Sequence, residues 1–314
     1  MSTIQYAAEA AAGAQSAWFV HRAGVAPEAR PASLADVLHL LGASADDWAA
    51  SCPVRVWRVR AGTPLYREGD PADTLHVVRF GAFKSLRTNE DGYEHVLGFA
   101  ATGDLLGFEG LATHCHPLGV VALEDASVLV LPTHDLESWR WHSPTLDRAL
   151  QRVVSRQLAR AGDTAAMMAA VAAEVRLARF LVWMSGRMAA RGESPNRFVL
   201  RMSRRDIASL LAVAHETVSR CFALLADCGY VNVRNRDVEI IDMPGLIACT
   251  RSTRRDTEDA TKRAGPATGR RARRSIEAAA ATTAVAAAEP ALAADAQRPA
   301  AERLSRDLGN FCPV

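Results

Sequence analysis

The chain has 314 residues, of which 49% are hydrophobic and 23% charged, and its formal net charge is +2. This length and composition favour a globular protein with two compact domains plus appendages, and they exclude a chain too polar to bury a core. The net charge is too small for a protein that is basic throughout, so a nucleic-acid-binding surface would have to be local.

The six cysteines are scattered, without a CxxC pair or another close spacing. This pattern argues against a disulfide framework and against a zinc knuckle, and it fits a reducing cytosol. The N-terminus has no basic segment followed by an apolar core, and no uncharged apolar run approaches about 18 residues. We therefore expect a cytoplasmic protein without a membrane partner.

Residues 1–32 are alanine-rich and aperiodic, which predicts a flexible N-terminal leader. Ser33 then precedes an amphipathic apolar pattern that ends near Gly42, as the N-cap of a short helix does. This helix introduces a first domain, which we place at residues 33–142.

Short alternating apolar runs follow, and turn residues separate them at close spacing. The runs that predict strands are 54–59, 74–80, 82–87, 95–99 and 126–132. Close turns between strands favour antiparallel hairpins in a double-sheet roll, and no βαβ alternation is present. The predicted fold class is therefore α+β, with an N-terminal jelly roll.

A long helical pattern begins after Ser143-Pro144, and we place it at residues 143–172. A helix of about 25 residues is longer than one small domain normally buries, so we expect a partner helix from a second copy of the chain. The alternative is that the stripe packs on its own domain. The residues assigned to the dimer seam are Leu150, Val153, Val154, Leu158, Ala161 and Met168.

A second domain is predicted at residues 173–246. A helix spans 174–191, and a short strand from Phe198 precedes two short helices. Ser203 is a plausible N-cap for the first of these, with Asp206 at N3. The second helix buries one face, and its opposite face carries His215, Glu216, Ser219 and Arg220. A solvated amphipathic pair would also show a polar face, so polarity alone does not establish DNA binding.

A helix that enters the major groove needs such a polar first turn, because arginine can donate to guanine O6 and N7 and glutamate can accept from cytosine N4. Gly229 ends this helix, and a hairpin follows whose tip offers Arg234 and Arg236 to phosphates. The order strand, helix, turn, helix, hairpin predicts a winged helix-turn-helix.

The sequence resembles the Crp/Fnr family of bacterial transcription regulators over roughly residues 33–245. The segments that carry the resemblance are Gly62–Asp70, Gly103–Phe108, Gly192–Leu211 and Glu216–Arg220. It implies a cyclic-nucleotide-binding-like roll, a long dimerisation helix and a winged helix-turn-helix. It also implies a homodimeric regulator that binds an inverted-repeat operator and contacts RNA polymerase through the exposed hairpin at residues 88–94.

By this resemblance, Glu216 and Arg220 contact base edges and Ser219 contacts a thymine of a TTGAT-type half-site, with His215 beside them. The residues expected at the DNA backbone are Ser203, Arg204, Arg205, Thr217, Arg234 and Arg236. Ala212 departs from the glycine that is usual in the turn of this family, and alanine should still fit there if its φ remains negative.

The sequence indicates the ligand of the roll less clearly than it indicates the DNA-binding residues. Cyclic AMP would need an Arg-Ser pair where this chain has His116-Pro117, and an Fnr-type iron-sulfur cluster would need N-terminal cysteines, which residues 1–51 lack. Leu129 stands where the cluster's last ligand would fall. We therefore predict no cofactor and no metal site. A haem, metal or redox role of His114-Cys115-His116 is the alternative left open.

The alternative functions are an effector-binding sensor and an enzyme. An effector-binding sensor, responding to a nucleotide, haem, gas or redox signal through the roll, is the second hypothesis. The sequence contains no motif of an enzyme active site, so no catalytic residues and no enzymatic activity are predicted. Residues 247–314 form a basic, then alanine-rich tail, for which we expect disorder and either added phosphate contacts or no role.

Overall fold

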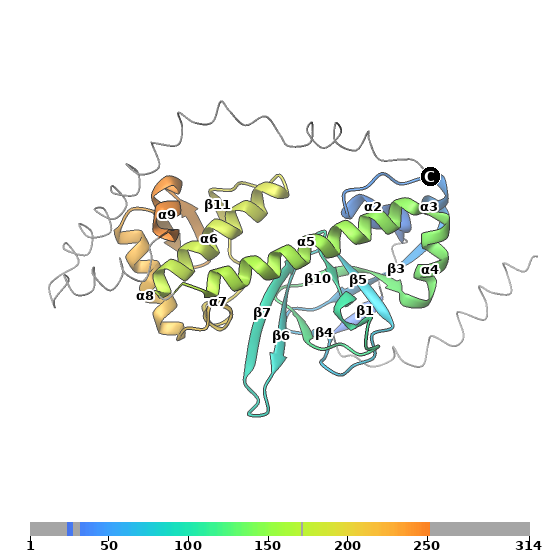
Figure 1. Cartoon of the computed structure of the whole chain (residues 1–314), viewed down its shortest axis with the longest axis horizontal. Helices are drawn as coiled ribbons and strands as arrows, with labels where there is room; N and C mark the ends of the chain where they lie inside the picture. Colours follow the sequence, from blue (N-terminus) through green and yellow to red (C-terminus); the bar gives the residue numbers. More distant parts are fainter. Residues whose placement is uncertain (1–23, 28–31, 171, 252–314) are drawn as a thin grey trace, which may run out of the picture. The chain divides into compact units, whose positions relative to one another are not determined.

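The computed structural model describes residues 24–27, 32–170 and 172–251 (Figure 1). These residues form two compact units, each built from several segments. The first contains the described chain up to Ala169, together with Phe198–Cys221 and Val233–Val238. The second contains the described parts of Ala170–Arg197, Phe222–Asn232 and the chain from Glu239.

The β-strands of the first unit form two antiparallel sheets. One sheet has the order β1 (Val25–Pro27), β3 (Pro53–Val59), β10 (Ala126–Pro132), β5 (Thr74–Phe80) and β8 (Leu105–Leu106), and β2 (Ala32–Ser33) also pairs with β3. The other has the order β4 (Pro64–Tyr66), β9 (Gly119–Ala122), β6 (Ala82–Thr88) and β7 (Glu94–Ala101). This arrangement confirms the predicted roll, because each of the five predicted runs overlaps a strand, namely β3, β5, β6, β7 and β10.

Two apolar clusters stabilise this roll. One contains Val78, Phe83 and Val120, which come from facing strands of the two sheets. The other joins Val77 and Leu129 of the first sheet to two helices, α2 (Leu34–Leu40) and α5 (Pro144–Met168). The N-cap predicted at Ser33 is confirmed, and the structure adds a capping box in which the Ser33 amide lies 2.7 Å from the Asp36 carboxylate. Helices therefore cover one face of the first sheet.

Several short elements were not predicted. They include the strands β4, β8 and β9 and the helices α3 (Asp47–Ser51), α4 (Thr133–His142) and the 3-10 helix η1 (Phe108–Gly110). α3 and η1 are too short to show a helical period, and none of the residues of α4 is buried, so α4 has no apolar stripe to reveal it. The leader also differs from the prediction, because Val25–Pro27 pairs with Trp57–Val59 as a strand.

The first half of the long helix α5 packs on its own unit. Leu146, Ala149 and Val153 lie in the cluster that joins the helices to the first sheet, and Gln157 donates to the Leu105 carbonyl at 2.5 Å. Beyond this point Leu158 is 75% exposed. The alternative interpretation, packing on its own domain, therefore describes the first half, and Val153, which is 2% exposed, faces its own core rather than solvent.

The second unit is organised around α6 (Ala173–Ala190) and α9 (Met243–Thr250). Arg179 donates through Nε to the Thr250 carbonyl at 3.1 Å, and Asp242 caps α9 by accepting from the Gly245 amide at 2.9 Å. The predicted domain end at residue 246 therefore falls inside a helix. The rest of the predicted tail, from residue 252, lies outside the described residues.

The predicted order of strand, helix, turn, helix and hairpin is confirmed. Its elements are β11 (Arg197–Val199), α7 (Arg204–Leu211), α8 (His215–Asp227), β12 (Val231–Arg234) and β13 (Asp237–Ile240), with the sheet order β11, β13, β12. α7 and α8 meet at 99°, within the range of helix-turn-helix pairs. In the described part of the chain no single helix could span a membrane; only this bent pair passes by length and composition.

Candidate nucleic-acid interface

α7 begins at a capping box that the sequence predicts. The Ser203 hydroxyl accepts from the Asp206 amide at 3.1 Å, and the Asp206 carboxylate accepts from the Ser203 amide at 2.9 Å and from its hydroxyl at 2.6 Å. These bonds satisfy amides that the first turn of a helix leaves open. Because the Ser203 hydroxyl is used in the cap, a phosphate contact from it remains only a prediction.

The turn between α7 and α8 depends on a left-handed residue. Ala212 has φ 49° and ψ 53°, and its amide donates to the carbonyls of Ala208 and Ser209. The condition of a negative φ is therefore not met, and Ala212 takes the left-handed conformation that commonly ends a helix. A residue with a Cβ in this conformation costs about 1 to 2 kcal/mol.

The four side chains predicted to contact bases lie together on the exposed first turns of α8. His215 and Glu216 are 52% and 65% exposed, with His215 Nδ1 3.2 Å from Glu216 Oε1. Arg220 donates to Thr217 Oγ1 at 3.4 Å, and Ser219 donates to the His215 carbonyl at 3.5 Å. Both hydrogen bonds are long, so the side chains are weakly held and can turn toward a partner.

The cationic residues around α8 fall into two groups. Arg205, Arg234 and Arg236 are exposed. Arg204 is half-buried and donates through Nη2 to the Asn235 carbonyl at 2.9 Å, and burial lowers the pKa of its guanidinium. Arg204 thus holds the tip of the β12–β13 hairpin, a role that the sequence does not reveal because the two residues are far apart in the chain.

α7 also contacts the roll. Lys84 Nζ lies 2.9 Å from Asp206 Oδ1, and the side chains are 17% and 13% exposed. Burial opposes the charge of Asp206, but hydrogen bonds from Ser203 and Lys84 outweigh it and hold the pKa of its carboxyl below the ordinary value. Ser209, 6% exposed, accepts from the Val96 amide at 2.9 Å. These contacts join the helix to strands β6 and β7.

Inside the roll, aromatic and acidic side chains pack against the glycine-rich segment at residues 103–110. Tyr66 stacks on His116 at 3.7 Å between ring centroids and donates to Glu109 Oε1 at 2.8 Å. Burial and the adjacent Glu109 carboxylate raise the pKa of Tyr66 well above its ordinary value. Hydrogen-bonded and stacked side chains therefore occupy this part of the roll.

The segment His114-Cys115-His116 does not converge on one point. His116 is buried against Tyr66, whereas Cys115 is exposed and His114 takes a left-handed φ of 56°. Within residues 24–27, 32–170 and 172–251, no group of three His, Cys, Asp or Glu side chains is arranged to hold a metal ion. The open alternative of a metal or haem at this segment gains no support from its geometry.

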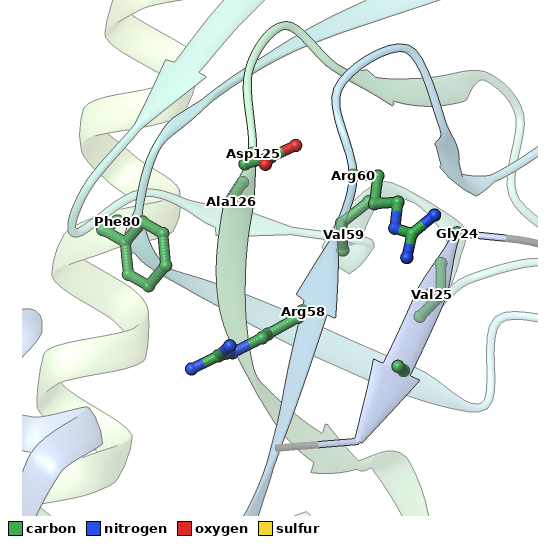
Figure 2. A pocket seen from close by; sticks show the side chains of 9 residues that line it. Gly24, Val25, Arg58, Val59, Arg60, Phe80, Asp125 and Ala126 are labelled. Carbon is green, nitrogen blue, oxygen red and sulfur yellow. The ribbon is translucent and has the colours of Figure 1, made fainter.

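A separate pocket of about 620 Å³ lies at the ends of β3, β10 and β1 (Figure 2). Its charged lining residues are Arg58, Arg60 and Asp125, and its apolar lining includes Phe80 and Val59. Asp125 Oδ1 accepts from the Ala61 amide at 2.9 Å. Figure 2 shows Arg58 extending away from β1, whereas Arg60 lies beside Gly24. No local sequence pattern predicts this pocket, because its residues come from four separate segments.

Two family profiles match this chain in the order in which the fold presents them. A cyclic nucleotide-binding domain matches residues 56–140, and a Crp-like helix-turn-helix domain matches residues 175–249. The first match covers most of the roll, and the second runs from α6 through α9. The matched segments thus include every residue predicted to contact DNA.

Relatives of this chain are transcription regulators. The chain is 37% identical to the transcriptional regulatory protein btr of Bordetella pertussis, over 60% of this chain and 78% of the relative. It is 36% identical to the transcriptional activator protein Anr of Pseudomonas protegens, over the same shares. The structure of FixK2 from Bradyrhizobium japonicum is 26% identical, covers 64% of this chain and 98% of FixK2, and has a TM-score of 0.58. Because the likeness spans both the roll and the helix-turn-helix, the chain belongs to the Crp/Fnr family of transcription regulators.

Proposed function

We propose that this regulator binds, as a homodimer in the cytoplasm, an inverted-repeat operator with TTGAT-type half-sites. The observation that carries the proposal is the exposed set of Glu216, Ser219 and Arg220 on the first turns of α8, which the left-handed Ala212 separates from α7. An exposed guanidinium and carboxylate at the start of a helix match the donors and acceptors of the major groove.

The proposed contacts divide between bases and phosphates. Arg220 donates to guanine, Glu216 accepts from cytosine, and Ser219 lies against thymine, with His215 at their edge. Arg205, Arg234 and Arg236 supply charge to phosphates, and each neutralised phosphate steepens the log-log salt dependence by about 0.9. Arg204 supports the hairpin that carries two of these arginines.

The second half of α5 is the proposed dimer seam. Its apolar stripe continues beyond the part that packs on its own roll, and Leu158 and Ala161 are exposed. Ala161 places no charge next to its symmetry mate, which favours dimerisation without a signal. We propose that Leu158, Ala161 and Met168 face the partner helix, together with Leu150 and Val154, which are partly buried against their own roll. Val153 supports them from its own core.

Operator binding is tested with the full chain and two duplexes of equal length. One carries inverted TTGAT half-sites about 10 base pairs apart, centre to centre, and the other is a scrambled sequence. We expect a preference of at least about a thousandfold for the operator at physiological salt. Sedimentation at micromolar protein reports the dimer in the same buffer. Equal affinity for the two duplexes would refute the proposal.

The exposed turn between β6 and β7, residues 89–93, is the proposed contact with RNA polymerase. Figure 1 shows these strands extending as a long hairpin, and Tyr93 at its turn is 55% exposed. Replacing residues 90 and 91 by alanine should abolish activation in a purified transcription assay and leave operator affinity unchanged. Unchanged activation would remove the contact from the proposal.

Effector binding by the roll is a second candidate, and the pocket beside β3 favours it. Two arginines and an aromatic ring suit an anion with a planar group. We also propose that the glycine-rich segment at residues 103–110 does not hold cyclic AMP, because the Tyr66–His116 stack rather than an arginine adjoins it. Calorimetry against cyclic nucleotides tests this, and an absorption spectrum of protein purified without oxygen tests for haem or an iron-sulfur cluster.

A further inference from the structure

The edge of the second sheet is completed by a helix of the DNA-binding motif. β7 is the outer strand of the order β4, β9, β6, β7, so its outward amides need partners. Ser209 of α7 accepts from the Val96 amide at 2.9 Å and donates to the Glu94 carbonyl at 3.3 Å. A serine inside a helix usually bonds its own helix or water. Here the Ser209 hydroxyl makes both its donor and its acceptor hydrogen bond with β7.

The neighbouring strand supplies the only lysine among the described residues. Lys84 lies on β6, between β9 and β7, with Val121 and Phe99 as its partners in register. Its ammonium is 2.9 Å from Asp206 Oδ1 and 3.5 Å from Glu94 Oε2. Because the strand is flanked on both sides, the lysine stem starts from a fixed position, and its partly buried charge is weakly screened by water.

Asp206 divides its two oxygens between two tasks. Oδ2 accepts from the amide and hydroxyl of Ser203 and so caps α7, while Oδ1 accepts from Lys84. The adjacent Arg204 donates to Asn235 at the tip of the β12–β13 hairpin. The first turn of α7 is therefore bonded to β6 of the roll at one residue and to the hairpin two residues earlier.

We propose that Lys84 is a positioning residue for operator recognition. α8 follows α7 after three residues, so a displacement of α7 displaces the base-contacting side chains of α8. Lys84 and Ser209 together fix α7 on the edge of the roll, and a change in β6 or β7 would be passed to α8 through these two contacts. This inference rests on the proposed operator-binding function and adds the means by which the roll controls it.

The test compares Lys84→Met with Lys84→Arg in the full chain, using the operator and the scrambled duplex. Methionine keeps the length of the stem without its charge, and arginine restores the charge. We expect Lys84→Met to lose about tenfold in operator affinity, with affinity for scrambled DNA and the salt slope unchanged because no phosphate contact is removed. Lys84→Arg should recover most of the loss. Arg87→Met, which removes a 55% exposed charge from the same strand, is the matched control and should behave as wild type.

Three outcomes would overturn the proposal. The first is that Lys84→Met binds the operator as tightly as wild type or more tightly. The second is that it loses equal affinity for scrambled DNA and shows a shallower salt slope, which would make Lys84 a phosphate contact. The third is that Lys84→Arg does not recover operator affinity. If Lys84→Met fails to fold, Ser209→Ala provides the same comparison by removing the acceptor for the Val96 amide.

Hydrogen exchange separates this proposal from the proposed function. The Val96 amide should exchange faster in Lys84→Met and in Ser209→Ala than in wild type or Arg87→Met. Wild-type protein without operator preference would refute the proposed function and leave accelerated exchange as support for the contact itself. Unchanged exchange at Val96 would refute the positioning role, whatever the DNA results.

Discussion

On the first turns of α8, His215 and Glu216 are more than half exposed, whereas inside the roll Tyr66 and His116 are almost fully buried and stacked on each other. On the α8 face, the hydrogen bonds of Arg220 to Thr217 and of Ser219 to His215 are 3.4 and 3.5 Å long, while Tyr66 donates to Glu109 at 2.8 Å. Polar groups satisfied by one another stabilise the fold, and weakly held exposed groups are available to a partner. Substitutions should therefore separate the two regions: α8 should affect DNA binding and the roll interior should affect stability.

The largest effect is expected at Arg220. Arg220→Ala should weaken operator binding by about 1 to 3 kcal/mol, because it removes the proposed bidentate contact to guanine. Binding to scrambled DNA and thermal stability should stay as in wild type. Arg55→Ala, which removes an exposed arginine from the roll, is the control for charge. An equal loss of affinity on both duplexes would make Arg220 a phosphate contact instead.

A substitution of Asp206 should affect both stability and DNA binding, because this residue contacts both α7 and the roll. Asp206→Asn weakens the cap of α7 and the pair with Lys84, so we expect a loss of about 1 to 2 kcal/mol in unfolding free energy, with weaker operator binding. Chemical denaturation measures the first and titration with operator the second. Asp163→Asn, an exposed position on α5, should change neither. Weaker operator binding with unchanged stability would contradict this account of the cap.

Asp206 should also make the unfolding free energy depend on pH. The folded pKa of Asp206 lies below its ordinary value of 3.8, so its contribution to stability is present above about that pH and is lost as the pH falls through the folded pKa. Asp206→Asn should therefore be nearest to wild type in stability at the lowest pH at which the protein folds. A constant difference between the two proteins from pH 7 down to pH 3 would exclude this assignment.

A substitution of Tyr66 should lower stability and leave operator affinity unchanged, which is the reverse of the effect expected for Arg220. Tyr66→Phe removes the hydroxyl that donates to Glu109, and a lost buried hydrogen bond costs about 1 kcal/mol. Operator affinity at temperatures well below unfolding should not change. Tyr93→Phe, at an exposed turn, is the matched control. If Tyr66→Phe altered operator preference at constant stability, the roll interior would belong to the signalling path rather than to the core alone.

Sequence was sufficient where a pattern is local and periodic. The alternating strands, the stripe of α5 and the capping box of Ser203 and Asp206 all follow from residues within one turn or one strand. The four base-contacting candidates could be placed on one face of α8 for the same reason. Their exposure agrees with that placement, while the bases they contact remain a prediction.

Contacts between distant segments could not be predicted in this way. Lys84 and Asp206 are 122 residues apart, and Arg204 is 31 residues from Asn235. Nothing in the local pattern marks either pair, and the expectation that Arg204 contacts phosphate follows only from the family resemblance. Whether α5 packs on its own roll or on a partner also depends on the tertiary fold, and its first half does the former.

Ala212 gives the smallest expected effect and the only stabilising one. Ala212→Gly should raise the unfolding free energy by about 1 kcal/mol or slightly less, because glycine removes the left-handed strain but loses more backbone entropy on folding. Ala214 lies in the same turn without a positive φ, so Ala214→Gly should be neutral or mildly destabilising. Thermal unfolding of the two variants beside wild type measures the difference. A loss of stability in Ala212→Gly as large as in Ala214→Gly would mean that the turn takes a right-handed conformation in solution, and the 99° angle that presents α8 to DNA would then need another cause.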